Sequence, residues 1–322
     1  MKLLGSLFSA FMLVFGAGTA QAADYPNRPI RVVVGYSPGG ATDIVARVVA
    51  DKLSSRFGQS VIVENRPGAG GNIAAAGAAK AAPDGYTLYF VTIATAISAT
   101  YYDNLQYNLA NDFAAVSQAS AMPSFLVVHP SLGVHSVKEL IALAKSRPGQ
   151  LDFSSSGMGG SPHLSGEMFK IMTGVDMTHI AYKGTVPQVT DLLSGVVKVA
   201  FPTMPGVIEH IKSGKLRALA VNSKERNAVA PDVPTMAEAG VPGFVDEAWN
   251  GIMVPTGTPK DIVNLLSAEI VKIMAMPDVQ EKLAAVGTIG VSSTPEDFDA
   301  YIKAEVRKWG EVVKTANVNA KP

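Results

Sequence analysis

Short apolar, β-branched runs alternate with segments whose apolar residues recur every three or four positions, nearly from end to end of the 322-residue chain. Runs of the first kind are typical of buried strands, and segments of the second kind are typical of amphipathic helices. The alternation predicts an α/β fold of β-α-β units, with mixed, mostly parallel sheets flanked by helices. The first predicted unit is a strand over residues 30–34 and a helix over residues 44–57, which Gly58 ends.

The same pattern predicts the remaining elements. Further strands are expected at 61–63, 86–91, 151–153, 179–182, 197–201 and 216–221. Further helices are expected at 71–82, 137–145, 164–172, 186–193, 207–212, 261–274 and 295–314.

Two extended runs, 124–128 and 249–254, break the alternation because neither has a clear helix of its own unit. Each lies beside proline or glycine, which suits a strand that crosses between two lobes. The prediction is therefore a lobe one of residues 23–123 plus 250–322 and a lobe two of residues 124–249. The last two predicted helices would pack back on lobe one.

The N-terminus combines one early cation, Lys2, with an apolar run and the small residues Ala20-Gln21-Ala22. This order is typical of a secretory signal peptide over residues 1–22, cleaved after Ala22. An uncleaved membrane anchor is the alternative, but the apolar run is shorter than the ~20 residues that a spanning helix needs. We expect a soluble, exported chain that works in the periplasm.

The charge balance is close to neutral, with 27 Lys and Arg against 27 Asp and Glu. Removal of Lys2 with the signal peptide hardly changes it. This balance argues against nucleic acid or an anionic membrane surface as the main partner. The chain has no cysteine, which excludes disulfides, thiolate metal sites and cysteine nucleophiles.

Candidate chemistry lies in the loops that follow the strands, because ligands of such sheets bind beyond the carboxyl ends of the strands. These loops are 36–43, 65–72 and 92–96 in lobe one, and 154–163, 182–185 and 202–205 in lobe two. Four are rich in glycine, serine or threonine, and so expose N–H groups at helix starts, where an anion is favoured. The alternative is that the glycines only make turns and that Ser37, Thr42 and Ser161 only cap helices.

Enzyme motifs are incomplete in these loops. The first turn has only the pair Gly39-Gly40 in place of G-x-G-x-x-G, no lysine follows in P-loop register, and G-x-S-x-G is missing from the serine-rich loop. His163 and Glu167 lie four residues apart, but a catalytic zinc would need a third ligand. Asp43 stands alone. We therefore expect no cofactor, no metal and no catalytic residues.

A series of short motifs runs through the chain in a fixed order. It comprises "YPNRPIRVVVGYSPGGATD", "ENRPGAGGNI", "PDGYTL", "SSSGMGGSPHLSGEMF", "IAYKG", "SGKLRALAV", "DVPTMAEAG", "WNGIMVPTGTP" and "KWGEVVK". The series resembles the extracytoplasmic solute-binding receptors of tripartite tricarboxylate transporters, often called Bug receptors. The resemblance implies a type II periplasmic binding protein whose two lobes are joined by two crossing hinge strands. It also implies a small organic acid as ligand, with its carboxylate held partly through ordered water.

The resemblance places the ligand-binding residues in the loops already named. In lobe one the expected residues are Tyr36, Ser37, Pro38, Gly39, Gly40, Asp43, Thr92, Ala94 and Thr95, and in lobe two Ser156, Gly157, Ser161, His163, Tyr182, Lys183 and Gly184. Where many family members carry an aspartate, this chain has Pro202, which argues against an amino-acid ligand. The apolar residues nearby, Phe201, Met204, Met158 and Trp249, either pack in the core or would suit an aromatic acid in the cleft.

The sequence thus predicts a non-catalytic, monomeric receptor that captures a di-, tri- or aromatic carboxylate. Its partner would be the membrane subunits of a tripartite tricarboxylate transporter. One alternative is a periplasmic sensory receptor for the same acids. Another is an exported serine hydrolase that uses Ser156 or Ser161 with His163.

Overall fold

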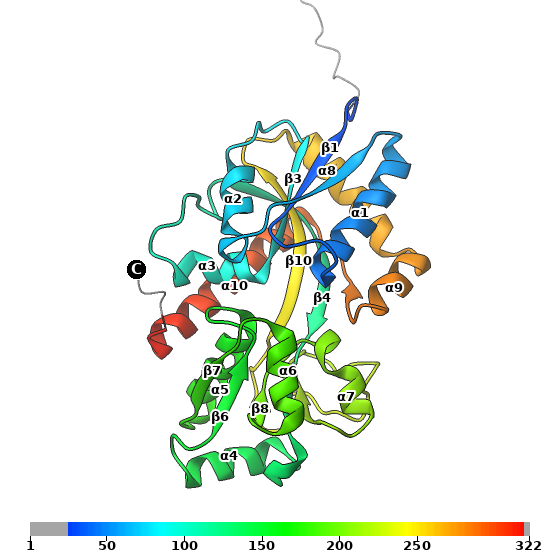
Figure 1. Ribbon diagram of the computed structural model, residues 1–322. Coiled ribbons are helices and arrows are strands. Elements are labelled where there is room, and N and C mark those ends of the chain that lie inside the picture. The colour runs from blue at the N-terminus through cyan, green and yellow to red at the C-terminus, as the bar shows by residue number, and fades with distance from the viewer. Residues whose placement is uncertain (1–24, 319–322) are drawn as a thin grey trace, which may run out of the picture.

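The computed structural model describes residues 25–318 and has two lobes, each built on one sheet (Figure 1). Lobe one has the sheet order β11-β4-β10-β3-β1-β2, and lobe two has β7-β6-β8-β5-β9. The strands of lobe one are β1 (Ile30–Val34), β2 (Val61–Asn65), β3 (Thr87–Thr92), β4 (Phe113–Pro123), β10 (Glu247–Pro255) and β11 (Ile289–Gly290). Those of lobe two are β5 (Phe125–Val128), β6 (Asp152–Ser155), β7 (Thr178–Ala181), β8 (Val199–Ala200) and β9 (Arg217–Val221).

Helices cover both sheets. Those of lobe one are α1 (Ala41–Phe57), α2 (Asn72–Ala79), α3 (Ile93–Tyr101), α8 (Lys260–Met274), α9 (Pro277–Ala284) and α10 (Pro295–Ala316). Those of lobe two are α4 (Val137–Ser146), α5 (Ser161–Thr173), α6 (Thr185–Ser194) and α7 (Ile208–Lys212). Short 3-10 turns are η1 (Ala69–Gly71), η2 (Pro130–Leu132) and η3 (Met204–Gly206).

Hydrophobic periodicity explains the first unit. Alternate residues of β1, such as Val32 and Val34, are buried in one cluster with Val49 and Leu53 of α1. The helix ends at Gly58, whose φ of 64° is left-handed and whose N–H bonds to the carbonyl of Ser54. Only glycine adopts this conformation at little cost, so the predicted stop is confirmed.

The other face of the lobe-one sheet packs in a core that continues into lobe two. This core includes Tyr89 of β3, Phe153 of β6 and Trp249 of β10. Helix α10 packs against α3 of lobe one and α5 of lobe two. The buried Glu305 of α10 accepts N–H bonds from both Trp249 and Trp309, at 3.1 Å each. The two lobes therefore share apolar contacts beside the strands that join them.

Two strands connect the lobes, as the sequence predicts. Strand β4 runs into β5 through Ser124, and the chain returns through Asp246 into β10 (Figure 1). The two connections are neighbours, since Glu247 pairs with Pro123 in antiparallel register. The lobe limits, 23–123 with 250–322 and 124–249, stay predictions.

Several expectations about the elements need correction. The sheets are mixed but not mostly parallel, because β10 is antiparallel to β3 and β4, and β5 is antiparallel to β8 and β9. These antiparallel strands are the segments that carry the chain from one lobe to the other. Residues 92–96, expected to be a loop, hold the start of α3, and α9 was not expected at all.

The predicted signal peptide lies outside the described residues. Within residues 25–318, the helices are all too short or too polar to span a bilayer.

Candidate ligand-binding cleft

Asp43 organises the loop that follows β1. It lies in the first turn of α1 and is almost fully buried. Its Oδ2 accepts hydrogen bonds from the N–H of Gly39 (2.9 Å) and from Nε of Arg47 (2.8 Å), and its Oδ1 accepts one from Nδ2 of Asn65 (2.7 Å). Burial alone would raise the pKa of Asp43, but these three hydrogen bonds together hold its pKa below the usual value. The carboxylate therefore faces inward and fixes the loop.

The exposed part of the same loop offers only small groups. Ser37, Pro38, Gly39 and Gly40 are exposed. Gly40 is the N-cap of α1, and in the described chain no side chain bonds to the free N–H groups of that helix start. A Cβ added at Gly40 would meet no atom within 4 Å. The start of α1 is thus open to an anion.

The loops after β1 and β3 meet beside this helix start. The hydroxyl of Tyr36 lies 3.2 Å from Oγ1 of Thr92, and Asn65 donates to the carbonyl of Tyr36 at 2.9 Å. Thr92 is the N-cap of α3, but its side chain makes no capping bond. Thr95 instead is buried and pairs with the hydroxyl of Tyr89 at 2.9 Å. The structure therefore brings Tyr36 and Thr92 together and turns Thr95 towards the core.

In lobe two, His163 holds the serine-glycine loop. Its Nδ1 accepts the N–H of Gly159 at 3.0 Å, and its ring stacks on His179 with centroids 4.0 Å apart. His179 in turn lies 2.7 Å from the hydroxyl of Ser155. Burial, with smaller contributions from nearby charges, lowers the pKa of His163 to about 3 and that of His179 to about 4. Both rings are therefore neutral near pH 7 and act as supports for the loop.

The remaining lobe-two residues that were predicted to bind the ligand differ in their exposure and in their bonding partners. Ser161 opens α5 and donates its hydroxyl to Oδ1 of Asp246 at 3.1 Å. Tyr182 donates to Oδ2 of Asp191 at 2.7 Å, and burial, with this carboxylate, raises the pKa of Tyr182 to about 12. Lys183 is exposed, while Ser156, Gly157 and Gly184 are partly exposed. In the described chain, α5 and α6 begin at Gly160 and Gly184 without a side-chain cap.

The two sets of loops approach each other at the rim of the cleft. A Cβ added to Gly159 would lie only 2.7 Å from Cε1 of Tyr101, at the end of α3. In Figure 1 the loops after β6 and β7 lie next to α3 and α10. Which of these residues contact a ligand stays a prediction.

Several residues that support the site were not predicted from the sequence. Arg47 and Asn65 fix the lobe-one loop, and Asp246 bonds to Ser161 although 85 residues separate the two. Asn65 was included only as part of a glycine-rich loop. No local spacing marks Asp246, because its contacts depend on the path of the whole chain.

The other side chains near these loops are buried in the cores, exposed or paired with a neighbour. Phe201, Met204 and Trp249 are buried in the cores, and Met158 is exposed. Arg66 pairs with Glu64 at 2.7 Å. Among the residues that the structure describes, no cluster of three or more His, Cys, Asp or Glu could hold a metal ion.

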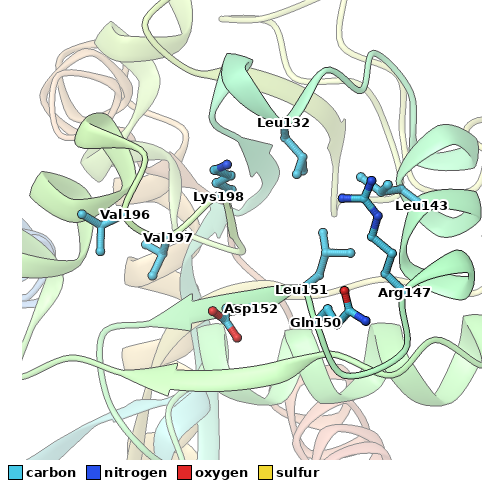
Figure 2. A pocket seen from close by; sticks show the side chains of 9 residues that line it. All are labelled: Leu132, Leu143, Arg147, Gln150, Leu151, Asp152, Val196, Val197 and Lys198. Atoms are coloured by element: carbon cyan, nitrogen blue, oxygen red, sulfur yellow. The ribbon is translucent and has the colours of Figure 1, made fainter.

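A separate cavity of about 270 Å³ lies at the opposite edge of the lobe-two sheet (Figure 2). Gln150, Leu151 and Asp152 border it at the start of β6, and Val197 and Lys198 border it just before β8. The loops discussed above follow the carboxyl ends of these strands. The cavity is therefore not part of the cleft between the lobes.

The stacked pair His163 and His179 predicts a pH-dependent stability. Because the folded pKa values of His163 and His179 lie below the ordinary histidine value of about 6.5, the unfolded chain binds more protons once the pH falls below about 6.5. Each histidine should then lower the free energy of unfolding by up to ~1.4 kcal/mol per pH unit. Urea unfolding of the wild type and of His163→Gln between about pH 5 and 6.5 measures this, and the variant should have the shallower slope. Equal slopes would contradict a neutral, buried His163, and His135→Gln, at an exposed histidine, serves as the control.

The chain is similar to proteins of one family. The model of the tripartite tricarboxylate transporter family receptor (TctC) matches residues 45–318. Protein BugT of Bordetella pertussis is 40% identical over 324 residues, which cover 100% of this chain and 99% of that protein. A solved R. palustris protein with adipate has a TM-score of 0.78 and 37% identity, over 92% of this chain and 99% of that one. MatC from Rhodopseudomonas palustris with bound malate has a TM-score of 0.75 and 31% identity, over 90% of this chain and 100% of that one.

These matches agree with the two-lobed periplasmic binding protein fold and with a carboxylate-binding, extracytoplasmic receptor. They confirm the resemblance that the ordered motifs carry. The chain belongs to the tripartite tricarboxylate transporter receptor family.

Proposed function

We propose that this protein captures one small organic carboxylate between its lobes, without chemical conversion, and delivers it to the membrane subunits of a tripartite tricarboxylate transporter. The observation that carries the proposal is the set of four helices, α1, α3, α5 and α6, that begin in the cleft loops. Within the described residues, none of these helix starts has a side-chain cap. Family members bind small carboxylates and work with a tripartite transporter.

Uncapped helix starts suit a carboxylate for two physical reasons. Their first N–H groups have no partner within the helix, and the helix dipole places partial positive charge there. A charge-assisted hydrogen bond to a desolvated carboxylate contributes ~1.5–3 kcal/mol. Closure of the lobes would add the donors of α5 and α6 to those of α1 and α3, so that the ligand is bound tightly only in the closed form.

The two carboxylates that would repel an anion near these loops are bonded to neighbouring groups. The carboxylate of Asp43 is bonded inside its loop, and Asp191 is engaged by Tyr182. The side chain of Pro202 supplies no acceptor for an ammonium group. We therefore propose a di-, tri- or aromatic carboxylate as ligand in preference to an amino acid.

The arrangement offers little support for a hydrolase. The Nδ1 atom of His163 is occupied by the N–H of Gly159, and Ser161 donates to Asp246. A serine nucleophile needs a base within hydrogen-bond reach. Ser155 lies 2.7 Å from His179, but this serine is fully buried. We propose that the protein is not an enzyme, that it acts as a monomer, and that residues 1–22 direct it to the periplasm.

A thermal-shift screen of residues 23–322 tests this function. Di- and tricarboxylates, aromatic acids and amino acids are compared at equal concentration. A ligand present at about 100 times its Kd stabilises the folded state by ~2.7 kcal/mol, so at least one carboxylate should raise Tm clearly. The proposal fails if no carboxylate shifts Tm, or if chromatography shows that the stabilising compound has been converted into a product.

A further inference from the structure

Five buried polar residues meet where the lobes join, and we call them the junction cluster. They are Ser124 on the first crossing segment, Asp246 on the second, Ser161 and Ser165 on α5, and Asn222 after β9. Asp246 is fully buried. The cluster therefore links both crossing segments to the helix that carries the lobe-two half of the cleft.

The junction cluster contains more close oxygen–oxygen contacts than serine hydroxyl hydrogens. Ser124 Oγ lies 2.7 Å from the carbonyl of Asp246 and 3.3 Å from its Oδ2. Ser161 Oγ lies 3.1 Å from Oδ1. Ser165 Oγ lies 2.7 Å from the carbonyl of Ser161 and also contacts Oδ2 of Asp246.

These are five oxygen–oxygen contacts with three hydroxyl hydrogens, since each serine supplies one. Ser124 can donate to the carbonyl of Asp246, Ser165 to the carbonyl of Ser161, and Ser161 to Oδ1 of Asp246. No hydroxyl hydrogen then remains for Oδ2 of Asp246. A proton on Oδ2 would bond to Ser165 and leave only the 3.3 Å contact without a hydrogen. Asn222 donates to Ser124 Oγ at 3.0 Å and does not change this count.

The charged groups around Asp246 do not compensate a negative charge on its carboxylate. The titratable groups that face it are Lys308, Glu305 and Tyr301 of α10, and Glu247 of β10. Lys308 is paired with Oε1 of Glu305 at 2.5 Å. From α5 and the first crossing segment, the described side chains that bond to Asp246 are serine hydroxyls. A buried carboxylate without a direct cationic partner is costly.

We propose that Asp246 is a neutral carboxylic acid that donates from Oδ2 to Ser165, accepts from Ser161 at Oδ1, and so positions the start of α5 against both crossing strands. In this arrangement Asp246 is a positioning residue for the lobe-two half of the cleft. The effect of Asp246 on ligand binding rests on the proposed function, whereas the proposal that Asp246 is protonated does not.

Asp246→Asn tests the protonation. The amide can donate to Ser165 and accept from Ser161, so it reproduces the neutral acid but not a carboxylate. Burial raises the pKa of Asp246, so the folded wild type keeps a proton that the unfolded chain releases above about pH 4. The wild type therefore loses stability as the pH rises towards the folded pKa, and the variant does not.

Urea unfolding of both proteins at about pH 5, 6, 7 and 8 measures the difference. The ratio of the unfolding constants, wild type over Asp246→Asn, should rise with pH by up to about tenfold per pH unit, until the pH passes the raised folded pKa of Asp246. Asp152→Asn, at an exposed aspartate of β6, is the control for the substitution itself. A ratio for Asp246→Asn that stays constant over this pH range would show that Asp246 is ionised and overturn the proposal.

Binding of the strongest carboxylate from the thermal-shift screen tests the positioning role. Asp246→Asn should bind within about twofold of wild type, because the amide restores both bonds. Ser165→Ala and Asp246→Val should bind at least about fivefold more weakly, since each removes a bond that holds α5. Wild-type affinity in both of these variants would contradict positioning. If the wild type itself binds no carboxylate, the proposed function fails while the pH result still decides the protonation of Asp246.

Discussion

Gly40→Val should weaken binding of the ligand at least about 100-fold and leave the free energy of unfolding almost unchanged. Gly40 has φ −79° and ψ 165°, an extended conformation that valine adopts readily, and an added Cβ meets no atom within 4 Å. The new side chain would project over the first N–H groups of α1 and exclude a carboxylate. A 100-fold loss corresponds to ~2.7 kcal/mol, about the contribution of one or two charge-assisted hydrogen bonds.

Isothermal titration gives the affinity and urea unfolding gives the stability of this variant. Ala285→Val is the matched control, because Ala285 is exposed at the end of α9 and away from the cleft loops. The control should bind as the wild type does. An unchanged Kd for Gly40→Val would mean that the ligand does not reach the start of α1.

Asp43→Ala should lower the free energy of unfolding by about 2–4 kcal/mol and abolish measurable binding. The change leaves the N–H of Gly39, the amide of Asn65 and the guanidinium of Arg47 without their shared acceptor. The loop after β1 would then lose the bonds that hold its N–H groups towards the cleft. Denaturation and titration on the same preparation separate the two effects.

The pH dependence of this variant has a defined sign. Because the folded pKa of Asp43 is lowered, its stabilising contribution is present above about pH 4 and is lost as the pH falls through the folded pKa. The stability difference between wild type and Asp43→Ala should therefore shrink in acid. Asp51→Ala, at an exposed aspartate of the same helix, should show neither effect. Full binding by Asp43→Ala would contradict the role of Asp43 in shaping the loop.

Local patterns could predict those elements whose apolar residues recur regularly, such as β1, α8 and α10. They failed for α3, where the run of alanine, threonine and isoleucine in "IATAISATY" gives no clear helical period. The antiparallel pairing of β10 with β3 and β4 also depends on how the chain returns from lobe two. Such long-range pairing leaves no trace in local spacing.

The candidate site shows the same limit. The sequence could predict the loops themselves, since strand ends and glycine-rich turns are local features, while their joint contact with a ligand stays a prediction. It could not predict that Asp43 and His163 bond to glycine N–H groups within their own loops. Nor could it predict that Ser124 and Asp246, 122 residues apart, meet between the lobes.

The central claim is that helix starts of both lobes hold one unmodified carboxylate. A crystal structure of residues 23–322 with the strongest carboxylate from the thermal-shift screen tests it most directly. We predict carboxylate oxygens within hydrogen-bond distance, about 2.7–3.2 Å, of N–H groups at the starts of α1 and α5. A ligand bound instead in the cavity beside Asp152 and Lys198, or a converted product in the cleft, would contradict the account.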